Sequence, residues 1–494
     1  MKNFHKKITE STFWLFLFQI VDNFLGFARL LILARLLSPN DFGLVAIAWL
    51  TLQTISTFTQ TGIYQTLIHK RNITNYLNTA WTYLFFRGIF LYLILYFITP
   101  YLGVFFHSYD SISVIRVIGL SLLLEGLTNI GTVYFQKNLL FHKQFILQII
   151  GNICDFIVAV SLAYILQNVW AIVYGSLANN IIRLLLSYIL SSYRPKFEFN
   201  LKQFKELNNY GKWIFGSSIM GFIYSQGDDI LVGRLLHSTA LGYYQLAYKI
   251  SNLPTTQITN LISTVMFPAY SQIQDDISRI SKIYTQILQL VTFLSIFVGT
   301  IIILFSGEFI RLFLGSKWLP MVASMQILTI WGVIRSIGAT IGPVWQAIGE
   351  PKTVTKIQLL QALILVLIIY PFTIYGNIVG TSIAVVIAAL IPNIIALYKI
   401  SLTINLPLET ILKEIIIPLV GSIIVVGVYY SMTFIYRDEN IFQFILLNIM
   451  LFFTYLFYAF VLHKMGKYSL FTNLLHLTKK SFNNKYIKMI EKYL

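Results

Sequence analysis

Charged residues inside long apolar runs are the groups in this sequence that could do chemistry. An ionisable side chain at membrane depth costs a few kcal/mol, so it is a functional candidate by default. Asp22 and Arg29 stand seven residues apart, two turns along one helical face, where they could shield each other or line one wall. The bases in such runs are Arg29, Arg35, Arg87, Arg116, Arg183, Lys249 and Arg335, and the acids are Asp22, Glu125, Asp155, Asp228 and Asp229.

The adjacent acids Asp228 and Asp229 raise the question of a metal site. Neighbouring helical residues splay about 100° apart, and no nearby loop offers His or further carboxylates to complete a metal cage. We therefore expect no metal; we expect these acids to line a wall or to pair with a base, with Arg234 close to Asp229 along the helix. The sequence also contains no Ser–His–Asp arrangement and no phosphate-cradling loop, which indicates a protein that is neither an enzyme nor dependent on a cofactor.

The amino-acid composition shows whether the segments that carry these charges lie in water or in a membrane. Hydrophobic residues make up 57% of the 494 positions and charged residues only 11%, less than half of the roughly 25% of a soluble domain. These values exclude a soluble enzyme and a disordered chain. They also argue against an outer-membrane barrel, whose strands alternate polar and apolar residues. The fold class is therefore an all-α polytopic membrane protein.

Apolar windows separated by polar breaks predict about fourteen transmembrane helices. A span needs about 20 predominantly apolar residues. Two separations are short, at Gln167-Asn168 and at Tyr375-Gly376-Asn377. The predicted spans are 12–37, 42–66, 78–104, 112–136, 145–166, 169–192, 213–233, 241–267, 283–306, 321–348, 357–374, 376–398, 414–434 and 441–463.

The distribution of basic residues predicts the orientation. With the N-terminus on the cytoplasmic side, the breaks on that side carry 25 Lys and Arg and the opposite breaks carry 4. Such asymmetry follows the positive-inside rule, so we expect both termini to be cytoplasmic. The net charge of +17 then reflects topology and contact with membrane lipids, and we expect no nucleic-acid partner.

The chain also repeats itself at an offset of 199 residues. Gly43 corresponds to Gly242, and Arg35 corresponds to Arg234. Because six spans separate the two copies, both halves have the same orientation, which is a transporter architecture with a site between two lobes. We expect two parallel six-helix lobes at 1–197 and 198–400, an extra helix pair at 401–463 and a basic cytoplasmic tail at 464–494.

A polar row recurs in both halves with the spacing i, i+4, i+7, which places each row on one helix face. One interpretation is hydrogen bonding between neighbouring helices, which is common for such residues in membranes. The other is that both rows line a wet central cavity. The rows are Gln53, Thr57 and Gln60 in the first half and Asn252, Thr256 and Thr259 in the second.

Several separated motifs resemble one family, the bacterial polysaccharide exporters of the O-antigen flippase type, within the multidrug/oligosaccharidyl-lipid/polysaccharide superfamily. The resemblance runs from about residue 12 to about residue 360. The segments that carry it are Arg35 to Leu44 (RLLSPNDFGL), Asp229 to Leu236 (DILVGRLL), Leu241-Gly242-Tyr243, Ala247-Tyr248-Lys249, Phe267 to Ser271 (FPAYS), Lys317 to Pro320 (KWLP) and Gly349-Glu350-Pro351.

The resemblance implies a V of two lobes that opens alternately to each side of the bacterial inner membrane. Its implied task is to move undecaprenyl-pyrophosphate-linked oligosaccharides to the outer leaflet for O-antigen, capsule or exopolysaccharide synthesis. Polysaccharide polymerase machinery is a possible partner, and H⁺ or Na⁺ a possible coupling ion. The alternatives are a multidrug exporter of the same superfamily, a membrane enzyme acting on lipid-linked glycans, and a structural scaffold.

Depth and periodicity assign provisional roles to the residues that stand out. A pyrophosphate head group needs cationic donors at membrane depth, which predicts contacts from Arg29, Lys249 and Arg335. Asp22 and Asp229 are the predicted pairing or coupling residues. The two polar rows are expected to face the glycan.

Overall fold

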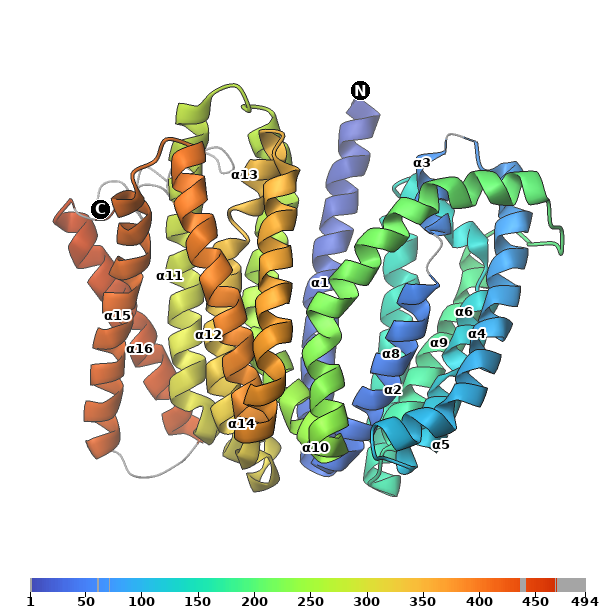
Figure 1. The fold of residues 1–494 in the computed structure, drawn as a ribbon, viewed down its shortest axis with the longest axis horizontal. Coiled ribbons are helices and arrows are strands. Elements are labelled where there is room, and N and C mark those ends of the chain that lie inside the picture. Colours follow the sequence, from blue (N-terminus) through green and yellow to red (C-terminus); the bar gives the residue numbers. More distant parts are fainter. Residues whose placement is uncertain (1, 60–61, 71, 436–440, 467, 469–494) are drawn as a thin grey trace. The chain divides into compact units, whose positions relative to one another are not determined.

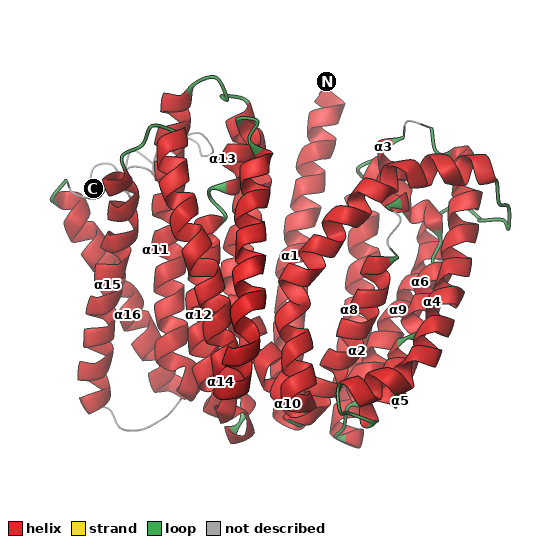
Figure 2. Ribbon diagram, viewed as in Figure 1, coloured by secondary structure: helices red, strands yellow, loops and turns green. Residues whose placement is uncertain are grey.

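The computed structural model describes residues 2–59, 62–70, 72–435, 441–466 and 468, and within these ranges every regular element is a helix (Figures 1 and 2). In the same ranges ten helices are long and apolar enough to cross a membrane, or eleven if the bent pair Asp110–Leu127 and Ile130–Lys137 counts as one span. The predicted all-α polytopic membrane fold is confirmed. The number fourteen stays a prediction.

The chain divides into two compact units. Unit 1 comprises Met1–Gln245 with Phe313–Trp318, and unit 2 comprises Leu246–Leu312 with Leu319–Leu494. The boundary falls inside one long helical segment. The lobe boundaries predicted at 197/198 and 400/401 are not tested by this division and stay predictions.

Unit 1 is built around helices that come from distant parts of its sequence. Helix α8 packs against both α1 and α9, α4 packs against α5 and α6, and α6 packs against α9 (Figure 1). The helices are α1 (Lys2–Leu36), α2 (Pro39–Phe58), α3 (Ile63–His69), α4 (Leu77–Phe105), α5 (Asp110–Ile118), α6 (Leu120–Leu127), α7 (Val133–Lys137), α8 (Phe141–Leu166), α9 (Trp170–Leu190) and the first part of α10 (Leu201–Ser271).

Among its described residues, unit 2 has two apolar cores. One surrounds Tyr284, Trp345 and Ile400, and the other surrounds Phe293 and Tyr455. Helix α11 contributes to both, and it packs against α12, α15 and α16. The helices of this unit besides the end of α10 are α11 (Ile277–Phe309), α12 (Val322–Gly338), α13 (Gly342–Ala347), α14 (Pro351–Thr403), α15 (Leu408–Ile435) and α16 (Ile441–Lys464).

Two of the long helical segments contain a reversal of the chain. His237 in α10 has φ 68° and ψ 178°, and Asn377 in α14 has φ 51° and ψ −143°. The arms of α14 fold back on each other, since the hydroxyls of Thr373 and Thr381 are 2.9 Å apart. His237 lies between the predicted spans 213–233 and 241–267, and Asn377 lies in the predicted short separation Tyr375-Gly376-Asn377, so that interruption is confirmed.

The backbone at Asn377 predicts a stabilising substitution. A side chain at positive φ costs about 1–3 kcal/mol that glycine does not incur, so Asn377→Gly should raise the free energy of unfolding by about 1 kcal/mol. The matched control is Asn448→Gly within α16, which should lower it by about 0.5 kcal/mol because glycine weakens a helix interior. Denaturant titration of the purified protein in micelles measures both values. A loss of stability in Asn377→Gly would contradict the assignment of strain.

Candidate functional site

An ion pair joins α1 and α8 within unit 1. Arg29 Nη2 lies 2.9 Å from Asp155 Oδ1, and the two side chains are 23% and 16% exposed. Glycine allows the helices around this pair to approach closely, because a β-carbon at Gly175 of α9 would lie 2.6 Å from Asp155 Oδ1. Asp155 was recognised in the sequence as an intramembrane acid, but its pairing with Arg29 was not predicted.

A second set of polar contacts continues from this pair across α1, α8 and α9. Asn152 donates from Nδ2 to Asp22 Oδ1, and its own Oδ1 accepts from Asn179 Nδ2 at 2.9 Å and from Arg183 Nη2 at 3.2 Å. Asp22 and Arg29 thus belong to one polar wall, which we call the α1–α8–α9 wall: Asp22, Arg29, Asn152, Asp155, Asn179 and Arg183. Its two acids and two bases balance in formal charge.

The acids of α10 lie in the hairpin that reverses at His237. Tyr244 donates its hydroxyl to Asp228 Oδ2 at 2.7 Å, and Gln245 donates from Nε2 to Asp229 Oδ2 at 3.0 Å. Asp228 is buried. The expected pairing of Asp229 with Arg234 is wrong. Arg234 instead donates to the carbonyl oxygen of Phe105 at 2.6 Å and lies beside His107. The reversal at His237 brings neutral donors, from Tyr244 and Gln245, to the two acids.

Within the part of the chain that the structure describes, no group of three or more His, Cys, Asp or Glu residues is placed to hold a metal ion. The hydrogen bonds from Tyr244 and Gln245 account for one oxygen of each α10 acid. Both acids are therefore structural partners of the hairpin, and a pairing or coupling role for Asp229 stays a prediction.

In unit 2 the structure brings Arg335 of α12 to the second polar row on α10. Arg335 Nη1 lies 3.4 Å from Thr256 Oγ1, and the guanidinium stands 5.3 Å from the centre of the Trp331 ring. Asn252 donates to the carbonyl of Tyr248 at 3.0 Å. Its Oδ1 is buried and has no hydrogen-bond partner among the described residues.

The remaining predicted residues lie in several environments. Gln53 on α2 and Lys249 on α10 are exposed, and Thr57 on α2 is half-buried. Thr259 has a buried hydroxyl without a hydrogen-bond partner within the described ranges. Gln60 lies outside the described residues. The expectation that all six row residues face a glycan stays a prediction.

The sequence repeat appears in the structure as a reciprocal contact at two glycines. A β-carbon on Gly43 would lie 1.8 Å from the carbonyl oxygen of Ser238, and one on Gly242 would lie 2.0 Å from the carbonyl oxygen of Pro39. Pro39 and Ser238 are themselves equivalent at the offset of 199 residues. The start of α2 and the segment after His237 therefore touch backbone to backbone, with each half using the same positions. We call this the reciprocal glycine contact.

The side chains of Lys317 and Trp318 cap the C-terminal end of α1. Trp318 donates from Nε1 to the carbonyl of Ala34 at 2.7 Å, and Lys317 donates from Nζ to the carbonyl of Arg35 at 2.9 Å. The last carbonyls of a helix lack partners within the helix, and a cation there also interacts favourably with the helix dipole. The motif at 317–320, noticed in the sequence only through a resemblance, thus caps α1.

The reciprocal glycine contact predicts a large effect from one added methyl group. Gly43→Ala and Gly242→Ala should each lower the free energy of unfolding by 1–3 kcal/mol or more, because the new carbon meets rigid backbone. Gly26→Ala is the matched control, since nothing lies within 4 Å of its added carbon, and helix propensity should make it neutral or stabilising. Equal thermal unfolding of all three variants in micelles would refute the contact.

The ion pair on α1 and α8 predicts non-additive stability effects. Arg29→Ala should cost about 1–3 kcal/mol, less than the 3–5 kcal/mol of a fully buried pair because both side chains are partly exposed. The double variant Arg29→Ala with Asp155→Asn should lose at least about 0.5 kcal/mol less than the two single losses together. Denaturant titration of the four proteins gives this coupling energy, and strictly additive losses would show that the pair does not interact.

Helices of membrane-spanning length, with ionisable groups that satisfy one another between them, define a multi-pass membrane protein. The fold is similar to "Lipid II flippase MurJ, inward closed conformation", with a TM-score of 0.75 and 18% identity, covering 91% of this chain and 99% of that one. It is also similar to an inward-facing multidrug resistance MATE family transporter, with a TM-score of 0.59 and 13% identity, covering 77% and 94%.

Residues 32–323 match the family of polysaccharide biosynthesis proteins, and the chain belongs to that family. The lipopolysaccharide biosynthesis protein WzxC of Escherichia coli K12 is 22% identical over 79% of each chain. The teichuronic acid biosynthesis protein TuaB of Bacillus subtilis 168 is 24% identical over 75% of this chain and 78% of that one. The resemblance to polysaccharide exporters is thereby confirmed.

Proposed function

We propose that this protein is a flippase that moves lipid-linked oligosaccharides across a membrane during polysaccharide biosynthesis. The observation that carries this proposal is the family match over residues 32–323, in a chain whose fold is similar to that of a lipid II flippase. Further relatives are named for the same kind of task. One is the succinoglycan biosynthesis transport protein ExoT of Rhizobium meliloti, 25% identical over 56% of each chain. These names also support a transporter over an enzyme.

The chemistry of the cargo explains why such a chain contains so many intramembrane charges. A pyrophosphate carries negative charge to membrane depth and needs cationic donors there. Arg29 and Arg335 each have at least one contact that fixes the guanidinium, to Asp155 and to Thr256 respectively, and Lys249 is exposed. A fixed guanidinium is already oriented when the head group arrives, which lowers the entropic cost of binding.

The finer features of the proposal concern direction and energy. The undecaprenyl-linked cargo moves from the cytoplasmic to the outer leaflet of the inner membrane by alternating access, with both termini cytoplasmic as the distribution of Lys and Arg indicates. Asp22 and Asp229 are the proposed coupling residues for H⁺ or Na⁺. One charge moved through 100 mV supplies about 2.3 kcal/mol. Polymerase machinery would receive the translocated unit.

A second candidate function is drug export, which the likeness to a MATE transporter favours at the level of fold. A cavity for cationic drugs would benefit from an excess of acids. The apolar runs instead contain seven bases and five acids. Cargo of negative charge is therefore the better match.

The sidedness of lipid-linked oligosaccharide in cells that lack this protein tests the proposal. Complete repeat units should accumulate on the cytoplasmic leaflet, where an added membrane-impermeant glycosidase cannot reach them in intact cells. The wild-type gene should restore exposure. Complete but unpolymerised units on the outer surface would overturn the flippase in favour of an enzyme or scaffold, and unchanged lipid-linked sugars would indicate drug efflux.

The same assay tests the cationic contacts. Arg29→Ala and Lys249→Ala should each reduce outer-leaflet exposure at least tenfold, since a charge-assisted hydrogen bond contributes about 1.5–3 kcal/mol. Arg29→Lys keeps the charge and should retain part of the activity. The matched control is Lys399→Ala, in a predicted cytoplasmic break. Wild-type rates for both Arg29→Ala and Lys249→Ala would show that neither side chain contacts the head group.

A further inference from the structure

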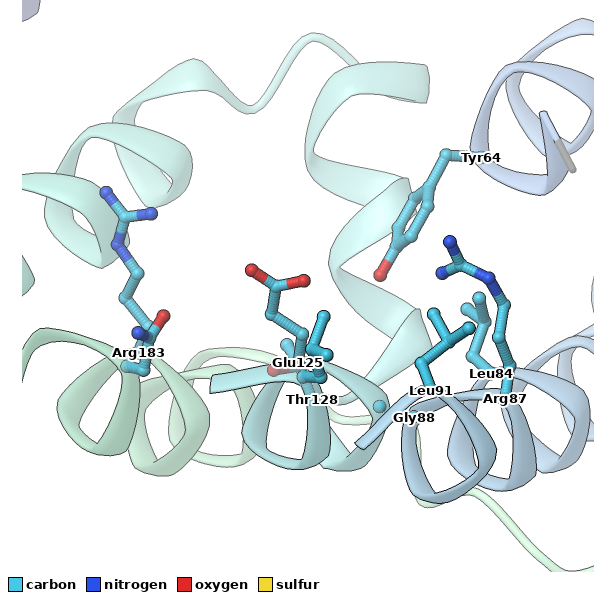
Figure 3. Close-up of a pocket in the computed structure, with 11 residues that line it drawn as sticks. Tyr64, Leu84, Arg87, Gly88, Leu91, Glu125, Thr128 and Arg183 are labelled. Atoms are coloured by element: carbon cyan, nitrogen blue, oxygen red, sulfur yellow. The ribbon is translucent and has the colours of Figure 1, made fainter. Parts of the chain in front are cut away.

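A separate cavity of about 270 Å³ lies within unit 1, between α3, α4, α6 and α9 (Figure 3). Its polar lining comes from all four elements, and three leucines supply an apolar wall. None of the residues predicted to contact the cargo lines it. The lining residues are Tyr64, Leu84, Arg87, Gly88, Leu91, Leu122, Glu125, Gly126, Thr128, Asn180 and Arg183.

Two glycines create the floor of this cavity. A β-carbon on Gly88 of α4 would lie 2.6 Å from the carbonyl oxygen of Leu122, and one on Gly126 of α6 would lie 2.8 Å from that of Leu84. Small residues at such a crossing let two membrane helices approach closely. The neighbours of these glycines, Arg87 and Glu125, are thereby brought to the same cavity. Arg87 is ten residues into α4, about 15 Å from its start, and lies within the candidate membrane span Thr74–Phe105.

Glu125 is the group whose surroundings call for a ligand. Figure 3 shows its carboxylate rising into the cavity, with Arg183 on one side and Tyr64 and Arg87 on the other. Across the described residues, neither the Glu125 carboxylate nor the Tyr64 hydroxyl has a hydrogen-bond partner or an ion pair. The Glu125 side chain is exposed to the cavity, and its carboxylate oxygens can only accept, so they are open to a donor that enters.

The arginines beside Glu125 are held by other groups. Arg87 donates to the carbonyl of Thr59 at 3.1 Å and to its hydroxyl at 2.8 Å, and also to the carbonyl of Ser56 at 3.3 Å, so it caps the end of α2. Arg183 donates to Asn152 at 3.2 Å. Both guanidinium groups are fixed in position, and each has five N–H donors, more than these bonds use.

The lining selects among the classes of ligand. Two guanidinium groups repel a metal cation, and a pyrophosphate drawn to them would place its charge against the Glu125 carboxylate. A sugar ring suits both kinds of group, because each hydroxyl donates to a carboxylate and accepts from a guanidinium or a phenol. The leucine side chains and the Tyr64 ring suit the C–H face of the ring. A volume of about 270 Å³ is just below the roughly 300–1,000 Å³ of pockets for drug-sized ligands, which suits one ring.

We propose that this cavity is a subsite for one neutral hexose of the cargo glycan, with Glu125 accepting from its hydroxyls and Arg87, Arg183 and Tyr64 donating to its oxygens. The proposal rests on the proposed function, since the sugar arrives as part of the lipid-linked oligosaccharide. The subsite uses none of the three bases proposed for the pyrophosphate, although its Arg183 also belongs to the α1–α8–α9 wall. It would make the flippase selective for glycan composition.

Binding of free sugars to the full-length protein in lipid nanodiscs tests the subsite without any transport step. Glucose, galactose and N-acetylglucosamine are the probes, observed by saturation-transfer NMR. At least one should bind the wild type. Glu125→Gln should weaken that binding at least tenfold, which corresponds to about 1.4 kcal/mol. The matched control is Glu409→Gln on α15 in unit 2, which should bind like the wild type.

Further variants and readouts keep the result decisive. Tyr64→Phe removes one hydroxyl and little else, so it should fold and should also weaken binding, and thermal unfolding verifies that each variant is native. Absence of binding by all three sugars, or equal binding by wild type and Glu125→Gln, overturns the subsite. If Glu125→Gln binds sugar like the wild type but shifts the pH profile of flipping, Glu125 only exchanges a proton and the subsite proposal is wrong. If the protein binds sugar but its loss does not change the sidedness of lipid-linked oligosaccharide, the proposed flippase function is wrong and the sugar site stands by itself.

Discussion

A polar group that this chain places in the hydrocarbon is stabilised by a partner within the protein or by a ligand. The bilayer core offers no water to an unpaired guanidinium or carboxylate, and a charge there costs several kcal/mol. The α1–α8–α9 wall meets this requirement with Asp155 beside Arg29 and with Asn152 joining Asp22 to Arg183. The positions of three helices follow from these contacts, because each side chain must arrive at the same depth as its partner.

Close helix packing depends on the same constraint. Polar side chains such as Asn152 and Asp155 are short, so the helices that carry them must approach closely before they can bond. Gly151 and Gly175 permit that approach between α8 and α9, as Gly88 and Gly126 do between α4 and α6. At Gly88 and Gly126 the neighbouring charged residues, Arg87 and Glu125, line a cavity without bonding to each other. Glu125 is in that position, which is why its surroundings suggest a ligand and those of Asp155 suggest structure.

Much of the fold could be predicted from the sequence because it depends on local composition. Apolar windows located the helices, and the breaks near His237 and Asn377 marked the reversals within α10 and α14. The pairing of Arg29 with Asp155 could not be predicted, since 126 residues separate them and a single sequence contains no record of such contacts. Asp229 was misassigned for a related reason. Proximity along the helix favoured Arg234, whereas the reversal of the chain supplied Gln245.

The reciprocal glycine contact has a consequence for the ancestry of the chain. Position 39 touches position 242 while position 238 touches position 43, which is the pattern of an isologous interface, where residue i meets j and j meets i. A half-length precursor carrying one such motif would form this contact with a second copy of itself as a symmetric homodimer. Gene fusion would then convert an association that depends on concentration into a permanent one. After fusion each glycine is constrained by a carbonyl of the other half, so the two copies of the motif cannot diverge independently.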